Sequence, residues 1–518
     1  MLFRSDRFEA VVVRPLEDAL NVSEPRRAKD INSLGEAPDS TWFTNRMGLR
    51  QLSLREVARG PNRGDGPDLS APLVILKSKG GGSAIGFVAE DVTGTRYILK
   101  FDHLKQPIIE TATDVVVQRI LWACGYNVPE NSVIYLGRDR LAVTERSTIR
   151  DAIGKRPLTE SDVDEVLTRV PGRADGRFRV LASKYLPGVP VGGISPVGVR
   201  EDDVNDTIRH EDRRVLRGLY VFFSWLQYTD VKSGNTLDMW VEDAERPGRH
   251  YVMHYLLDFG KSLGAFGPLH GRIYDGHAYN FDFMYDFLSL FTLGLWQRPW
   301  EGTPDPGLPG LSPLDAEHFD PGAWKPHWPY SPFRHMDEYD GYWAAKIVMS
   351  FTPAHIRVAV EQGRFDHARA VEHLTRVLVQ RQRRIGEYWF RRVNPLDGFA
   401  LGEREGRVRL CFDDLLLRHG LADRTSGRYA ATSFNFSGKS LGWRADVRPG
   451  IGTAATGNEQ GHAYTACVDG FSLAENNHGY TIVRLDTWRG DRRLLPVEVH
   501  IARHPISGVA RIIGIHRR

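Results

Sequence analysis

The sequence predicts an α+β protein with a two-lobed core, in which a small β-rich lobe precedes a larger helical lobe, and with a C-terminal all-β domain. Short β-rich runs at 73–77 and 96–101 lead into residues 108–123, whose apolar side chains recur at helical spacing. Helical patterns dominate again at 338–392. Alternating apolar residues return near the C-terminus, most clearly in Val497–Ile501, which indicates strands.

Domain boundaries follow from changes in composition along the chain. The first 70 residues are polar and contain scattered Pro, Arg and Gly, so we expect an extension that packs on the next domain. Pro187 and Pro190 interrupt the pattern where the small lobe passes into the larger one. We expect an N-terminal extension at 1–70, a small lobe at 71–186 with an insertion at 145–176, a larger lobe at 187–398, and a β domain, predicted to be a sandwich, at 399–518.

The composition is that of an ordinary globular protein, with 41% hydrophobic and 26% charged residues in a chain of 518. The formal net charge of +3 is too small to favour nucleic acid as a partner. The three cysteines, Cys124, Cys411 and Cys467, have neither metal-ligand spacing nor the spacing of a disulfide framework. This pattern is typical of a reducing compartment.

The chain contains no apolar stretch of the roughly 18 residues that a membrane-spanning helix needs. The nearest candidate, residues 281–296, contains Asp282 and Asp286, and we expect a buried aromatic-rich helix there. Charged residues also stand near the N-terminus, where a signal peptide would have its apolar core. We therefore expect a cytoplasmic protein without a membrane span.

The β-rich run at 96–101 carries one lysine, Lys100, among apolar residues. A lysine in such a setting needs an acidic partner that fixes it and keeps it charged. Glu110, early in the predicted helix that follows, is the natural candidate. A lysine held in this way can contact the α- and β-phosphates of a nucleoside triphosphate. The structural alternative is an edge-strand lysine whose ammonium group snorkels to water.

A predicted helix at 212–228 leads directly to Asp230-Val-Lys232-Ser-Gly-Asn235. Asp230 can accept a proton from an attacking hydroxyl or orient it. Lys232 can place its ammonium group where charge develops on a transferring phosphoryl group. Asn235 offers an amide oxygen, which suits a hard cation such as Mg²⁺.

Asp258-Phe259-Gly260 follows a short apolar run that ends at Leu257. The carboxylate of Asp258 is a second hard oxygen ligand of the kind that Mg²⁺ prefers. Twenty-two residues lie between Asn235 and Asp258, and a β-hairpin that turns at 243–248 accommodates them.

Four glycines, Gly80, Gly81, Gly82 and Gly86, follow the first β-rich run. Glycines at such a place let backbone N–H groups approach phosphates without obstruction by Cβ atoms. The alternative interpretation of the run is a flexible linker.

This ordered set resembles the protein-kinase-like superfamily, in its atypical bacterial HipA-like and CotH-like branches, over roughly residues 71–395. Asp230-x-Lys-x-x-Asn235 matches the catalytic-loop pattern, Asp258-Phe-Gly260 matches the metal-binding motif, and Lys100 with Glu110 matches the strand-lysine and helix-glutamate pair. The resemblance implies a kinase fold that binds ATP and Mg²⁺ between two lobes. It also implies transfer of the γ-phosphoryl group to a hydroxyl of a protein or a small molecule.

The chain also departs from the family pattern. Tyr228-Thr229 stand where His-Arg usually precede the catalytic Asp, so a phosphorylated activation loop would have no Arg partner there. Only Gly82-x-x-x-Gly86 remains of the glycine-rich loop, and no Ala-Pro-Glu motif follows. Three functions stay open: an atypical protein kinase, a kinase of small molecules or glycans like the aminoglycoside-phosphotransferase relatives, and a pseudokinase-like ATP-binding or scaffold protein.

Overall fold

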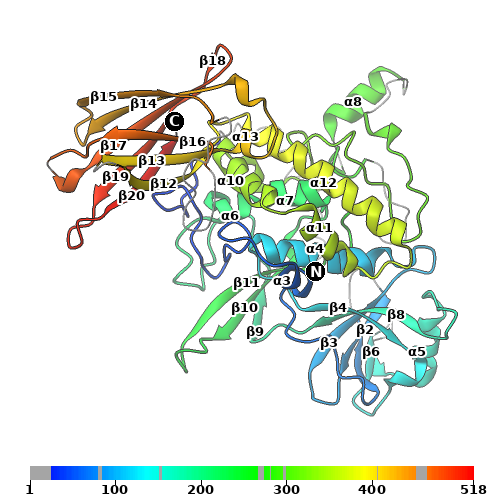
Figure 1. Cartoon of the computed structure of the whole chain (residues 1–518). Helices are drawn as coiled ribbons and strands as arrows, with labels where there is room; N and C mark the ends of the chain where they lie inside the picture. The colour runs from blue at the N-terminus through cyan, green and yellow to red at the C-terminus, as the bar shows by residue number, and fades with distance from the viewer. Residues whose placement is uncertain are drawn as a thin grey trace. The chain divides into compact units, whose positions relative to one another are not determined.

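The computed structural model describes residues 25–79, 85–150, 154–266, 274–280, 282–293, 295, 299–404, 407–450, 464–475 and 477–517. Helices and strands both occur throughout, so the predicted α+β class is confirmed (Figure 1). The chain forms two compact units. The first comprises Met1–Arg26, Asp39–His335 and Ser350–Gln382, and the second comprises Arg27–Pro38, Met336–Met349 and Arg383–Arg518.

The main sheet of the first unit has the order β4-β8-β3-β2-β1-β6-β7, and β5 pairs with β1. Its strands are β1 (Leu73–Ser78), β2 (Ile85–Glu90), β3 (Arg96–Phe101), β4 (Asn131–Leu136), β5 (Leu141–Ala142), β6 (Thr148–Arg150), β7 (Lys155–Pro157) and β8 (Phe178–Lys184). Strands β1, β2 and β3 are antiparallel neighbours, and β3 also pairs with β8. The runs at 73–77 and 96–101 therefore form strands as predicted. The short helix α5 (Glu160–Leu167) packs its apolar face on this sheet through Val163 and Val166.

The helix predicted at 108–123 is α4 (Ile109–Cys124), and nearly all of its residues are buried. It packs against β4 and β8 of the sheet and against two other helices, α3 (Leu54–Arg59) and α11 (Pro353–Glu361). Gly125 ends α4 with a φ of 134°, and a Cβ atom there would lie 2.2 Å from the ring of Phe43. The glycine at the end of α4 thus serves both the backbone turn and the packing of Phe43.

The first unit also has a helical part, which comprises α6 (Arg214–Arg217), α7 (Leu219–Leu226), α11 and the N-terminal part of α12 (Ala368–Phe390). The indole of Trp225 on α7 donates to the carbonyl of Leu378 on α12 at 2.9 Å. A second sheet has the order β11-β10-β9, formed by β9 (Val189–Gly192), β10 (Thr236–Glu242) and β11 (His250–Leu256). Strands β10 and β11 pair antiparallel, which confirms the predicted hairpin at 243–248.

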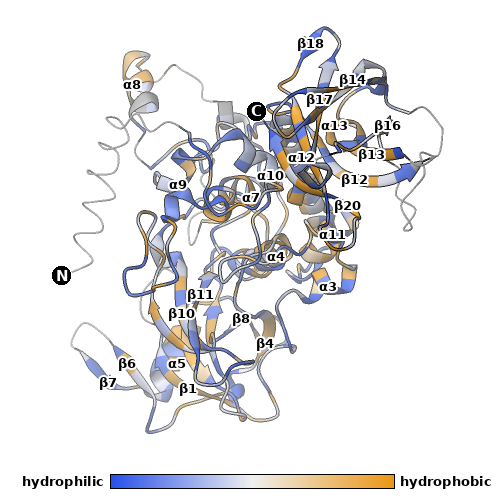
Figure 2. Ribbon diagram, turned by 90° about the vertical axis from the view of Figure 1, so that its left-hand side faces the viewer, coloured by the Kyte–Doolittle hydropathy of each residue, from blue (hydrophilic) through white to orange (hydrophobic). Residues whose placement is uncertain are grey.

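A helix forms within 281–296 as predicted, but the prediction that it is buried is wrong. The helix α8 (Phe283–Phe291) forms there and is strongly apolar (Figure 2). However, Leu290 and Phe291 are 72% and 73% exposed, and Leu293 beyond the helix is 87% exposed. Composition alone predicted burial, whereas burial depends on whether another element covers the helix. Parts of the predicted range, residues 281, 294 and 296, lie outside the described residues.

The second unit contains two antiparallel sheets that share one apolar core. The smaller sheet has the order β12-β13-β16, with β12 (Leu396–Arg404), β13 (Arg407–Asp414) and β16 (Ala466–Phe471). The larger sheet has the order β15-β14-β17-β19-β20 with β18 on β17, and its strands are β14 (Gly427–Asn435), β15 (Ser440–Val447), β17 (Thr481–Arg489), β18 (Arg492–Arg493), β19 (Val497–Arg503) and β20 (Ala510–Arg517). Phe412 of one sheet and Tyr429 of the other pack edge to face at 5.2 Å in this core, as in a β-sandwich. The helices α10 (Glu338–Met349) and α13 (Leu415–Arg418) also belong to this unit.

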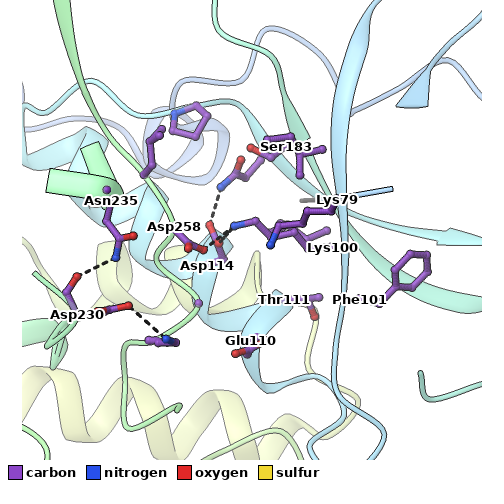
Figure 3. Close-up of a pocket in the computed structure, with 18 of the residues that line it drawn as sticks. Lys79, Lys100, Phe101, Glu110, Thr111, Asp114, Ser183, Asp230, Asn235 and Asp258 are labelled. Carbon is purple, nitrogen blue, oxygen red and sulfur yellow. Dashed lines mark hydrogen bonds and ion pairs between the residues drawn. The ribbon is translucent and has the colours of Figure 1, made fainter. Parts of the chain in front are cut away.

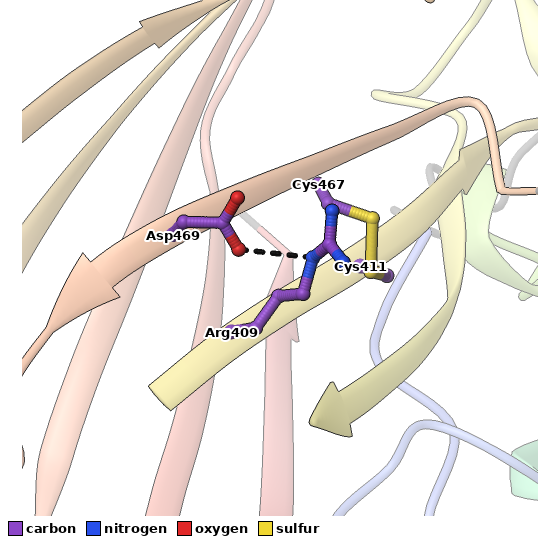
Figure 4. The surroundings of a disulfide bond; sticks show 4 residues. All are labelled: Arg409, Cys411, Cys467 and Asp469. Atoms are coloured by element: carbon purple, nitrogen blue, oxygen red, sulfur yellow. Dashed lines mark ion pairs between the residues drawn. A yellow bond between two sulfur atoms is a disulfide. The ribbon is translucent and has the colours of Figure 1, made fainter. Parts of the chain in front are cut away.

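The prediction that the cysteines form no disulfide is wrong. Cys411 on β13 lies directly opposite Cys467 on β16, and the two form a disulfide across 56 positions of sequence (Figure 4). Two positions along these strands from the cysteine pair, Arg409 and Asp469 form an ion pair at 2.9 Å. The pairing depends on the register of two strands that are distant in sequence, so cysteine spacing could not indicate it.

Within the described residues, we find no helix that combines the length and the apolar character required to cross a bilayer.

Candidate functional site

Lys100 on β3 forms the centre of the candidate site. Its neighbours across the sheet are Gly86 on β2 and Leu181 on β8, so the strand on one side carries no side chain beside it. Its ammonium nitrogen lies 2.7 Å from Oδ1 of Asp258 and 3.2 Å from Oδ2 of Asp114 (Figure 3). Burial opposes the charge, but the two carboxylates outweigh burial and raise the pKa of Lys100 above its ordinary value.

The partner of Lys100 on α4 is Asp114, and not Glu110 as predicted. Glu110 opens the helix one turn earlier, is 8% exposed and lines the same cavity. Burial and the nearby Asp102 and Asp258 raise the pKa of Glu110 to about 7. Lys100 is therefore held by Asp114, while Glu110 is a buried acid close to it.

Asp230 and Lys232 lie together in the loop that follows α7. The ammonium group of Lys232 lies 2.9 and 2.8 Å from the two carboxylate oxygens of Asp230, and that of Lys261 lies 3.3 Å from Oδ2. Burial raises the pKa of the Asp230 carboxyl, but Lys232 and Lys261 outweigh burial, so the net shift is downward. The structure thus favours Asp230 in its ionised form.

Asn235 ends the short turn that joins this loop to β10. Its side-chain Nδ2 donates to the backbone carbonyl of Asp230 at 2.8 Å, and its backbone carbonyl accepts from the backbone N–H of Leu257 at 2.9 Å. These bonds tie the Asp230 loop to the segment that carries Asp258. The side-chain oxygen of Asn235 is the atom that suits a cation ligand.

Asp258 follows β11 with a φ of 59°, in the left-handed region that Asp and Asn adopt more readily than most residues. Its side chain is 53% exposed, and Lys100 is the main cause that lowers its pKa to about 2. Phe259 is fully buried and packs edge to face on Tyr228 at 5.8 Å. Tyr228 also donates to the carbonyl of Leu257 at 3.3 Å, so it anchors the Asp258 segment.

The predicted glycines differ in what the structure describes. Gly80, Gly81 and Gly82 lie outside the described residues. Gly86 lies in β2, where a Cβ atom would be 1.9 Å from the carbonyl oxygen of Leu99 on β3. Gly86 therefore permits close approach of two strands beside Lys100.

One cavity of about 680 Å³ in the first unit collects the charged residues of the site. Its walls include four lysines and four acids, namely Lys79, Lys100, Lys232, Lys261, Glu110, Asp114, Asp230 and Asp258, together with Asn131 and Asn235. All six predicted side chains, Lys100, Glu110, Asp230, Lys232, Asn235 and Asp258, thus line the same cavity. Such a mixed arrangement of cations and carboxylates suits a phosphorylated ligand that brings a divalent cation.

Four further charged or amide side chains of the cavity were not predicted as site residues: Lys79, Asp114, Asn131 and Lys261. Asn131 donates to Oδ1 of Asp114 at 2.7 Å and so fixes the partner of Lys100. Two of the four carried a signal in the sequence. Asp114 is four residues after Glu110, hence on the same helix face, and Lys261 directly follows Gly260.

The donor set for a metal is small. Among the described residues, no group of three or more His, Cys, Asp and Glu side chains is placed to hold an ion. The carboxylate of Asp258 and the amide oxygen of Asn235 are hard donors in the same cavity. They fit Mg²⁺ in the form that is common for nucleotide sites, with one or two protein ligands and with phosphate and water completing the shell.

Searches with this chain against protein-family models, curated proteins and solved structures find no match.

Proposed function

We propose that the protein is an ATP- and Mg²⁺-dependent phosphotransferase of the atypical kinase type. One observation carries the proposal: Lys100 joins a carboxylate of α4 to Asp258, in the cavity that also holds Asp230 and Lys232. The order of these residues along the chain is the order of the kinase-like motifs. Their shared cavity supports a common function.

Each side chain has a proposed role. Lys100 binds the α- and β-phosphates, and Asp114 keeps it in place. Asp230 orients the acceptor hydroxyl and takes its proton, and Lys232 stabilises the charge on the γ-phosphoryl group. Asp258 and Asn235 hold Mg²⁺, which when bound neutralises the phosphate charge.

Thermal-shift measurements with ATP, with and without Mg²⁺, test the proposal. We expect ATP with Mg²⁺ to raise the melting temperature of the wild type and Asp258→Ala to abolish nearly all of this shift. Loss of a metal ligand should also reduce phosphotransfer by at least about a hundredfold, equivalent to about 3 kcal/mol. Asp491→Ala, at an exposed position of the second unit, is the control. A wild type that binds no ATP with Mg²⁺ would contradict the proposal.

The acceptor is the open part of the function. Intact-mass measurement after incubation with ATP separates self-phosphorylation, which adds about 80 Da per phosphoryl group to this chain, from transfer to a small molecule or glycan. The requirement for ATP favours the cytoplasm. The cysteines no longer support a reducing compartment, because Cys411 and Cys467 form a disulfide and disulfides are typical of oxidising compartments.

A pseudokinase-like ATP-binding or scaffold protein is the second candidate. The specific observation is that Lys232 contacts both carboxylate oxygens of Asp230 and Lys261 contacts one of them. If this arrangement persists with nucleotide bound, the two ammonium groups lower the basicity of Asp230 and make it a poorer acceptor for the proton of a hydroxyl. Nucleotide binding without phosphotransfer would favour this candidate, whereas phosphotransfer that requires Asp230 would exclude it.

A further inference from the structure

A second cavity of the first unit, of about 490 Å³, is lined mainly by cations. Its charged residues are Arg55, Arg59, Arg63, Arg119, Arg364 and Asp65. We call this set the arginine pocket. Helix α3 supplies Arg55 and Arg59, and α4 supplies Arg119. Five guanidinium groups thus share the pocket with one carboxylate.

The arginines of the pocket are not used to pair with acids of the chain. In the part of the chain that the structure describes, none of the five forms an ion pair, and the side chains of Arg55, Arg63 and Arg364 make no hydrogen bond. Arg50, only a few residues before the pocket, shows the contrast, because it lies 2.6 Å from Glu56. The positive charge of the pocket is therefore not compensated by ion pairs within the described chain, and it favours an anionic ligand.

Arg119 shows that the pocket is built into the fold. Its side chain is only 5% exposed, and its donors reach neutral oxygens: the carbonyl of Ala58 at 2.8 Å, Oδ1 of Asn62 at 3.0 Å and the carbonyl of Asn131 at 3.2 Å. Glu130 acts on Arg119 electrostatically but forms no ion pair with it, and a buried guanidinium without such a pair is unfavourable unless an anion comes close. Burial indeed lowers the pKa of Arg119 to about 10.

The chain also makes room for Arg119 at one glycine. Gly60 ends α3 with a φ of 58°, and a Cβ atom there would lie 2.6 Å from Cδ of Arg119. The left-handed conformation and the close approach both require glycine at this position. The buried arginine is thus placed by the local structure of α3 and α4 together.

We propose that the arginine pocket binds a small anion with two or more phosphate groups, of the pyrophosphate type. The planar guanidinium group donates two parallel hydrogen bonds to a phosphate, and several such groups together match a multiply charged ligand. The volume falls in the range of small-molecule sites. This site is separate from the proposed ATP site, and the two have no wall residue in common.

Isothermal titration with inorganic pyrophosphate, in a buffer without Mg²⁺, tests the proposal. We expect binding to the wild type and roughly tenfold to hundredfold weaker binding to the double variant Arg55→Gln, Arg63→Gln, because two charge-assisted contacts are lost. These side chains make no hydrogen bond within the described chain, so the variant should melt like the wild type without ligand. The control, Arg249→Gln with Arg492→Gln, removes the same charge from exposed positions outside the pocket and should bind as the wild type does.

Pyrophosphate could also enter the cavity around Lys100, so Lys100→Met completes the design. We expect this variant to keep its affinity for pyrophosphate and to lose the ATP-dependent thermal shift, whereas the double arginine variant should keep the ATP shift. Failure of the ATP shift alone would overturn the proposed function and leave the arginine pocket standing. Absence of pyrophosphate binding at about 1 mM, equal binding by the arginine variant and its control, or loss of binding in Lys100→Met would overturn the proposal of this site.

Discussion

Lys100 shows how much of the site depends on single residues that lie far apart in sequence. Its two carboxylates come from α4 and from the segment after β11, 14 and 158 positions away. A lysine that is 14% exposed keeps its charge because both acids are close. The ion pairs also hold α4 and the Asp258 segment at a fixed distance from β3.

The sequence predicted Lys100 but misidentified its partner on α4. Glu110 and Asp114 are four residues apart and therefore lie on one helix face. Which of the two reaches Lys100 depends on how α4 packs against the sheet, and this is tertiary information. Motifs such as Asp230-x-Lys-x-x-Asn and Asp258-Phe-Gly were easier to predict, because the residues of each motif lie close together in sequence.

Because Asp114 pairs with Lys100, the affinity for ATP should depend on Asp114. Asp114→Asn removes one of the two charges that hold Lys100, so we expect roughly tenfold to hundredfold weaker binding of ATP with Mg²⁺. Glu110→Gln should weaken binding by less than about threefold, because Glu110 makes no ion pair with Lys100. Titration calorimetry with both variants measures the difference. A larger effect of Glu110→Gln than of Asp114→Asn would restore Glu110 as the functional partner.

Glu110 instead predicts a pH dependence of stability. Its folded-state pKa of about 7 lies above the ordinary 4.5, so between these values the folded state holds a proton that the unfolded state has released. Stability should therefore fall as the pH rises through this window and level off above it. Glu110→Gln removes the titrating group, and its stability relative to the wild type should rise by about 3 kcal/mol from about pH 5 to about pH 8.

Urea unfolding of both proteins at several pH values measures this change. Glu245→Gln, on an exposed turn, serves as the control and should keep a constant difference from the wild type. A difference that stays constant for Glu110→Gln as well would mean that Glu110 titrates in its ordinary range.

At the scale of elements, local pattern predicted the parts of the fold that position the site. The strand of Lys100, the helix after it and the hairpin between Asn235 and Asp258 all form where periodicity and turn residues placed them. The exposed helix α8 did not follow its pattern, because an apolar run indicates burial only when another element covers it. Burial is a property of pairs of elements, which one segment alone does not encode.

Helix α4 contributes to the cavity around Lys100 and to the arginine pocket. Glu110 and Asp114 line the cavity around Lys100, and Arg119, just over one turn later, lines the arginine pocket. Gly86 similarly combines two roles on β2, because the absent side chain lets β3 approach and leaves space beside Lys100. The apolar spacing of α4 predicted a packed helix, but it did not indicate that charged residues of the helix are buried and line two cavities.

At the scale of the whole molecule, the division into compact units does not follow the order of the sequence. Residues 27–38 and 336–349 belong to the second unit together with the C-terminal strands. Glu36 and Asp397 illustrate the reason, because both pair with Lys346 of α10. Composition along the chain shows where the local sequence pattern changes, but it does not indicate which distant segments pack together.

The disulfide of the second unit gives the last prediction. It closes a loop of 56 positions, and the loss of chain entropy in the unfolded state is worth about 4 kcal/mol for a loop of this length. We expect Cys411→Ser with Cys467→Ser to lower the stability of this unit by about that amount in calorimetry. Reductant should destabilise the wild type similarly and leave the double variant unchanged.

Thiol titration of the unfolded chain checks the disulfide directly. Of the three cysteines, Cys124 alone is free, so the unfolded wild type should show one reactive thiol without reductant and three after reduction. Three thiols before reduction would mean that Cys411 and Cys467 stay reduced, which would again be typical of a protein in a reducing compartment. One thiol would instead favour a protein that folds where disulfides form, and ATP would have to be present there for the proposed phosphotransfer.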